Sequence, residues 1–132
     1  MLQGSERVPT VVVAVSPSSG VAAVVDRIQE ACRDGARFAV LIDARGVGDG
    51  GEEMDAGARR ALVGRLRALR GDLKHLCAGV VFLAGPPAGE RGRRLRAAGL
   101  LFGCPVHATA SLDAAREWLA ARGAIVPEGV QP

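Results

Sequence analysis

The stretch Arg37-Phe-Ala-Val-Leu-Ile-Asp-Ala-Arg-Gly46 decides the fold of this chain. Five consecutive apolar residues at positions 38–42 predict a strand that is buried on both faces. The strand stops at a carboxylate, Asp43, and a glycine- and acid-rich loop and a long arginine-rich helix follow. A buried strand that leads through a loop into a helix is one step of a parallel α/β sheet. In such sheets the functional residues commonly lie at the carboxyl ends of the strands.

Other segments extend this pattern along the chain. Runs of β-branched and apolar residues predict strands at residues 10–15, 38–42, 78–84 and 105–109. Helices are predicted at residues 21–32, 55–75 and 90–98, and after Ser111. The order βαβαβαβα with right-handed crossovers predicts a single α/β sandwich: a mostly parallel sheet of four or five strands with helices on both faces. We expect the domain to cover residues 10–126, after a polar lead-in at residues 1–9 and before a C-terminal tail at residues 127–132.

Length and composition favour one globular domain. The chain has 132 residues, of which 48% are apolar, which is enough for one core. The cysteines are odd in number and widely spaced, and no apolar run approaches the roughly 20 residues of a membrane helix. Without a secretory segment, we expect a cytoplasmic protein with reduced, buried thiols. No Cys-x-x-Cys pair is present and the two histidines have no nearby ligand partner, so we expect no metal.

The charge is unevenly distributed. Residues 59–96 hold ten basic and two acidic side chains, although the net charge of the whole chain is only +3. Such a dipolar surface favours an oriented encounter with an acidic partner, although solvated helix faces would give the same pattern. Nucleic acid is not an expected partner, because aromatic residues are few, only one lysine is present and no reading motif is found.

The sequence holds no complete catalytic constellation, so we expect neither catalytic residues nor a cofactor. Gly46, Gly48 and Gly51 match the G-x-G-x-x-G spacing, but they follow the second predicted strand, beside acidic residues that would repel a pyrophosphate. Asp43 and the loop carboxylates could in principle hold a hard cation. The acidic pair and the lysine that a phosphoacceptor domain also needs are missing at the expected strands. We therefore expect Asp43 to end the strand and to accept hydrogen bonds from the loop that follows.

A second basic segment follows the third predicted strand. There, several glycine amides lie close to three arginines, an arrangement that suits an anion. These arginines are Arg91, Arg93 and Arg94. They form a candidate anion-binding site, although ordinary solvated arginines would look the same.

Several segments, taken in order, resemble the STAS-like family, the anti-sigma-factor antagonists and their stage II sporulation AA-like relatives. The segments that carry the resemblance are Val40-Leu-Ile-Asp-Ala-Arg-Gly-Val47, Met54-Asp-Ala-Gly57, Gly79-Val-Val-Phe-Leu-Ala-Gly85, Leu95-Arg-Ala-Ala-Gly-Leu-Leu101 and Ser111-Leu-Asp-Ala-Ala-Arg-Glu-Trp-Leu119. Together they cover about residues 10–122. The resemblance implies a non-enzymatic regulatory domain that docks another protein through the loop at residues 46–55 and the helix that follows it.

One departure from the family concerns its switch. The family's loop typically carries a serine that a partner kinase phosphorylates, whereas this chain has Ala56 at that position and a longer preceding loop. The resemblance therefore implies docking without a phosphorylation switch. The implied partner-binding residues are Asp49, Asp55, Ala56, Gly57, Arg59, Arg60 and Arg67. The alternative is binding of a small apolar or anionic ligand at the carboxyl ends of the strands. A catalytic role of Asp43 and the cysteines is a third interpretation, and self-association remains open.

Overall fold

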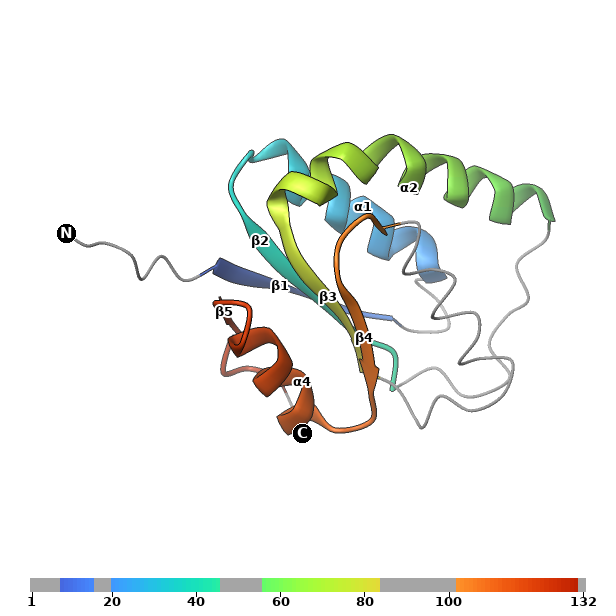
Figure 1. Ribbon diagram of the computed structural model, residues 1–132. Coiled ribbons are helices and arrows are strands. Elements are labelled where there is room, and N and C mark those ends of the chain that lie inside the picture. Colours follow the sequence, from blue (N-terminus) through green and yellow to red (C-terminus); the bar gives the residue numbers. More distant parts are fainter. Residues whose placement is uncertain (1–7, 16–19, 46–55, 84–101, 131–132) are drawn as a thin grey trace.

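The computed structural model describes residues 8–15, 20–45, 56–83 and 102–130. They form a parallel α/β fold with a five-stranded sheet in the order β4-β3-β2-β1-β5 and three helices (Figure 1). The elements are β1 (Val8–Ala14), α1 (Gly20–Arg33), β2 (Phe38–Asp43), α2 (Ala56–Leu76), β3 (Cys77–Leu83), β4 (Val106–Thr109), α4 (Leu112–Ala120) and β5 (Ala124–Ile125). The predicted fold class is thus confirmed.

The order of the strands explains where the helices lie. From β1 to β4 the chain moves across the sheet in one direction, and then it returns past three strands to place β5 beside β1. Right-handed crossovers that run in opposite directions put their helices on opposite faces of a sheet. Accordingly, α1 and α2 cover one face and α4 covers the other (Figure 1).

Strand β2 lies in the middle of the sheet and is buried on both faces, as its sequence predicts. Residues 38–42 are at most 3% exposed, and only Asp43, at the end of the strand, is half-buried. The strand contributes to both cores: Val40 and Ile42 face α1 and α2, whereas Ala39 and Leu41 face α4. This alternation is the period of two that a strand imposes on its side chains.

Helix α2 buries a line of leucines on the side that faces the sheet. Leu66 and Leu73 are buried, and Leu62, Leu69 and Leu76 are half-buried against the same core. Spacings of four and three residues keep these side chains on one stripe of the helix. The opposite side of α2 therefore faces solvent.

Several boundaries differ from the prediction. Strand β1 begins at Val8, inside the expected lead-in, because the Val8 N–H donates to the Gly123 carbonyl at 2.8 Å. Pro9 is tolerated there, since the ladder with β2 begins only at Thr10 and no ladder bond is lost. The predicted helix at residues 90–98 lies outside the described residues.

Candidate functional site

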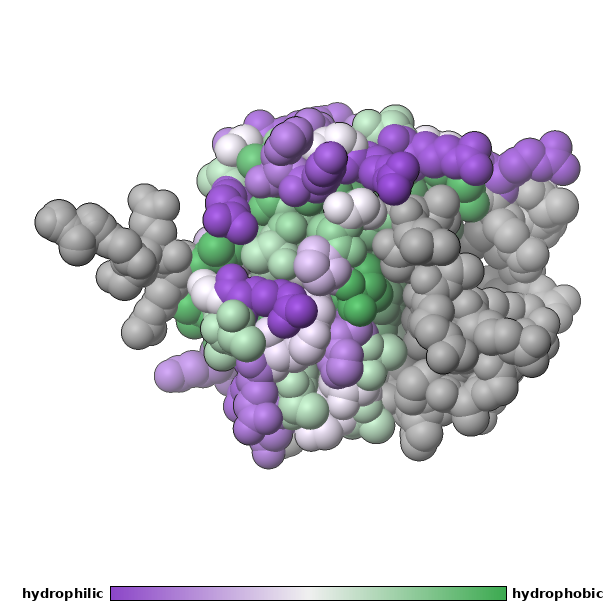
Figure 2. All heavy atoms as spheres, viewed as in Figure 1, coloured by the Kyte–Doolittle hydropathy of each residue, from purple (hydrophilic) through white to green (hydrophobic). Residues whose placement is uncertain are grey.

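The most distinctive surface among the described residues is the outer side of α2. Five exposed residues lie there at spacings of four, three, four and three, opposite the buried leucines. This basic line consists of Arg60, Gly64, Arg67, Gly71 and Lys74. Its three cations repeat every seven residues, which is about 10 Å along a helix that rises 1.5 Å per residue. Figure 2 shows hydrophilic side chains along the upper rim of the molecule, where α2 runs.

The two glycines of the basic line have no role in the packing of the described residues. A Cβ atom added at Gly64 or Gly71 would meet nothing within 4 Å, and neither residue has a positive φ. A glycine within a helix costs about 1 kcal/mol relative to alanine. Because the glycines have no side chains, the helix backbone is uncovered at two positions between the cations. Another molecule can approach the backbone closely at these two shallow places.

Other basic residues of α2 stabilise the fold. The Arg65 guanidinium donates to the Asp26 carboxylate at 2.6 Å and to the Gln29 side-chain oxygen at 3.0 Å, which joins α2 to α1. Arg70 packs against Gly103, where an added Cβ would lie 2.8 Å from the Arg70 Cγ. By contrast, Arg60, Arg67 and Lys74 make no ion pair with the residues that the structure describes.

The structure places only some of the predicted partner-binding residues. Ala56, Gly57 and Arg59 lie in the first turns of α2, and Arg60 and Arg67 are exposed further along it. The others lie outside the described residues, as do the arginines of the candidate anion site. These residues are Asp49 and Asp55, and Arg91, Arg93 and Arg94.

At the carboxyl end of β2, Asp43 is paired with Arg45. The Asp43 carboxylate accepts hydrogen bonds from the Arg45 N–H at 3.1 Å and from its guanidinium at 2.9 Å on each oxygen. The hydrogen bond from the Arg45 side chain lowers the pKa of Asp43 and raises the pKa of Arg45. The expectation that Asp43 accepts hydrogen bonds from the loop that follows is confirmed. No group of three or more potential metal ligands lies among the described residues.

The three cysteines come together on the α1–α2 side of the sheet, which their spacing did not predict. Cys77 is buried at the start of β3, whereas Cys104, just before β4, and Cys32, at the end of α1, are half-buried. The Cys77 thiol donates a hydrogen bond to the Gly79 carbonyl at 3.5 Å. Its side-chain interaction with Cys104 raises the pKa of Cys77 and lowers that of Cys104. Burial raises the pKa of Cys32. The cysteines meet because parallel strands begin at the same end of a sheet. This contact can be predicted only when the order of the strands is known.

On the opposite face, Trp118 forms a stack that sequence reasoning also missed. Trp118 is half-buried, and its ring lies over β3 and the edge strand β4. Its ring is nearly parallel to the His107 ring, with centroids 5.4 Å apart, and the Arg122 guanidinium carbon lies 3.7 Å from its centroid. The ring also packs on Gly79, where an added Cβ would lie 2.7 Å from it. The i,i+4 spacing of Trp118 and Arg122 was the only local signal.

Comparisons with models of protein families, with curated proteins and with solved structures find no match for this chain. Among the residues that the structure describes, no helix combines the length and the apolar character needed to cross a membrane.

Proposed function

We propose that this chain is a non-enzymatic interaction domain that docks an acidic protein through the basic line of α2. The observation that carries the proposal is the alternation of exposed cations and exposed glycines along the side of α2 that faces away from the core. Neither residue type on this line contributes to the packing of the described residues.

Each part of the basic line has a separate role in this proposal. Arg60, Arg67 and Lys74 supply long-range attraction, which mainly accelerates association and weakens with salt. Gly64 and Gly71 let the partner approach the helix backbone between the cations. Binding of a small ligand at the strand ends is less well supported, because Asp43 and Arg45 are already paired with each other there.

The test is a charge reversal on the basic line. A partner captured with the wild-type chain should bind the Arg60→Glu, Arg67→Glu double variant at least tenfold more weakly, which is about 1.4 kcal/mol. The fold should be unchanged by circular dichroism, because both side chains are exposed. The matched control is a pair of single variants: Arg67→Glu should weaken binding, whereas Arg37→Glu makes the same charge change at an exposed residue off the line and should not.

A second variant separates binding from stability. Gly64→Ala combined with Gly71→Ala should stabilise the helix by about 0.5–1 kcal/mol per site, since the added methyl groups meet nothing. The same variant should bind the partner more weakly, because the methyl groups fill the shallow places. The proposal would be refuted if the arginine double variant and the glycine double variant both bound the partner as tightly as the wild type. Preferential capture of a DNA duplex by the same line would replace the acidic protein with nucleic acid.

A further inference from the structure

The outer edge of β1 is only partly paired. Strand β5 lies beside it but pairs only with Val8 and Pro9, while β1 continues to Ala14. Over residues 10–14, the side of β1 that faces away from β2 has no strand partner in the described part of the chain. Strand β5 thus occupies the outer edge of β1 only at its beginning, and the residues after β5 continue along a hollow at this edge without pairing with β1. The unpaired part of this edge is called the vacant lane.

The backbone of β1 points its hydrogen-bonding groups into this lane. The Val15 N–H donates to the Asp43 carbonyl on the β2 side at 2.8 Å, and the Val8 N–H donates to Gly123 on the other side. Backbone groups alternate in direction along a strand. The N–H and C=O groups of Val12 and Ala14 therefore face the vacant lane. Another extended backbone can pair with such a row of groups.

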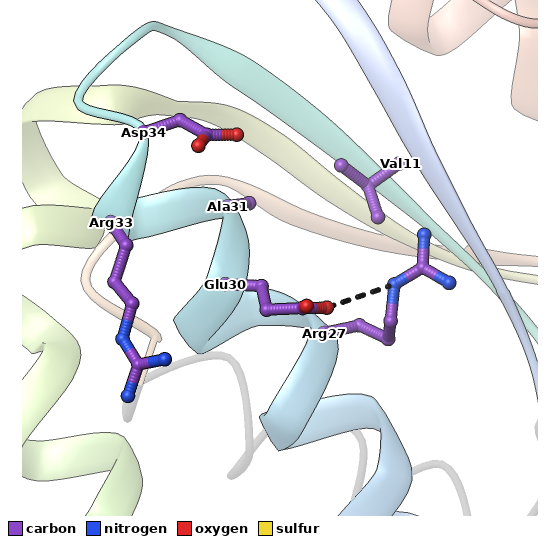
Figure 3. A pocket seen from close by; sticks show the side chains of 6 residues that line it. All are labelled: Val11, Arg27, Glu30, Ala31, Arg33 and Asp34. Atoms are coloured by element: carbon purple, nitrogen blue, oxygen red, sulfur yellow. Dashed lines mark ion pairs between the residues drawn. The ribbon is translucent and has the colours of Figure 1, made fainter.

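Two hollows border the vacant lane. The one beside α1 has a volume of ≈ 440 Å³ and is lined by Val11, Arg27, Glu30, Ala31, Arg33 and Asp34 (Figure 3). The other has a volume of ≈ 610 Å³ and is lined by Thr10, Val11, Val12, Ala14, Arg27, Asp43, Pro127, Gly129 and Val130. Both hollows share Val11 and Arg27, so they meet at the edge of β1. Side chains that alternate along an added strand would enter one hollow and then the other.

The charge of Arg27 indicates which kind of added strand would fit at this edge. The Arg27 side chain extends toward Val11, and the Glu30 carboxylate faces it (Figure 3). This ion pair is long, 3.8 Å, and both side chains are more than half exposed, so it holds the guanidinium weakly. A carboxylate on an incoming strand would meet Arg27 at the junction of the hollows. A second copy of the chain would bring its own Arg27 already paired with Glu30, so it would offer no unpaired carboxylate at this position.

We propose that the free edge of β1 binds an extended peptide of a partner protein by strand addition, in the lane that β5 leaves vacant. The peptide carries β-branched residues at alternate positions and an acidic residue opposite Arg27. Main-chain hydrogen bonds supply affinity and the two hollows supply specificity. One further observation fits: Thr10, 7% exposed, lines the larger hollow, and its hydroxyl has no hydrogen-bond partner among the described residues.

The test is a selection from a displayed library of peptides about seven residues long. Enriched peptides should alternate β-branched residues and contain an acidic residue. In the wild-type chain, the best peptide should protect the Val12 and Ala14 amides from hydrogen exchange. The same peptide with alternate amides N-methylated cannot pair and should bind at least tenfold more weakly. Equal binding of the methylated peptide, or no enrichment, would overturn the proposal.

Variants at one exposed position add a matched pair. Ala14→Pro removes an N–H that faces the lane but no bond to β2, and it should weaken binding at least tenfold. Ala14→Val keeps the N–H and adds only two methyl groups at the larger hollow, so it should weaken binding far less than Ala14→Pro. Arg27→Gln should remove the preference for an acidic residue.

If instead Ala14→Pro abolishes a dimer seen by light scattering, the occupant is a second copy and the proposal is wrong. The Arg60→Glu, Arg67→Glu variant should bind the peptide normally, so this test is independent of the proposed function.

Discussion

The two ends of the parallel sheet are held together differently. At the carboxyl end, Asp43 and Arg45 are two residues apart and pair at the surface, with 21% and 29% of their side chains exposed. At the amino end, Cys77 and Cys104 meet beneath α1 and α2, and Gly79 packs on Trp118 of α4. The contacts at the carboxyl end are therefore partly exposed to solvent and join residues that are close in sequence. The contacts at the amino end are packed and join segments that are distant in sequence. This contrast predicts where a substitution disturbs the fold most.

The largest effect is expected at Gly79. Gly79→Ala places a methyl group 2.7 Å from the Cη2 and Cζ3 atoms of Trp118, so the ring must shift. Overpacking of this kind costs about 1–3 kcal/mol, which urea denaturation measures. Gly64→Ala is the control, because its methyl group meets nothing and the variant should be slightly more stable than the wild type.

A double variant identifies the cause of that loss. If the Trp118 ring is the obstacle, Gly79→Ala should cost much less stability in a Trp118→Leu background than in the wild type. If the losses of unfolding free energy were simply additive, Gly79 would be needed for another reason. The contact between Gly79 and Trp118 would then not be what holds α4 against the amino end of the sheet.

A smaller effect is expected at the carboxyl end. Asp43→Asn removes a charge-assisted pair that is partly screened by water, so the loss should be about 1 kcal/mol at neutral pH. The pKa of Asp43 is lowered by Arg45, so the pair stabilises the fold fully above the unfolded pKa of about 4. The advantage of the wild type should shrink as the pH falls below about 4, toward the lowered pKa. An advantage that is the same at pH 3 and pH 7 would contradict the pairing.

The smallest effect on stability is expected for the thiols, where reactivity is the sensitive measurement. Cys104 should be alkylated by iodoacetamide before Cys77 and Cys32, because its pKa is lowered whereas theirs are raised. Peptide mapping by mass spectrometry gives the order. Cys77→Ala removes the side chain that lowers the pKa of Cys104 and should slow alkylation of Cys104. An unchanged rate would argue against the interaction between the two thiols.

The same contrast explains how much could be predicted. The apolar run at residues 38–42 and the leucines of α2 are periodic, so the sequence predicts β2 and the buried side of the helix. Asp43 and its loop are also local, and the hydrogen bonds expected there are present. The cysteine cluster, the packing of Trp118 on Gly79 and the pairing of β5 with β1 each require the order of the strands. Local patterns do not contain that order.

The place of β5 has a consequence for how the molecule folds. Val8 pairs with Ala124, so the first and last strands of the fold are neighbours. Pairs such as β1 with β2 involve nearby segments and can form while synthesis continues, whereas this pair raises the contact order and closes the largest loop in the fold. We therefore expect β5 to dock last, after the sheet from β1 to β4 has formed. Until then, the whole outer edge of β1 is available to other chains, which makes this strand the place where a folding intermediate would aggregate.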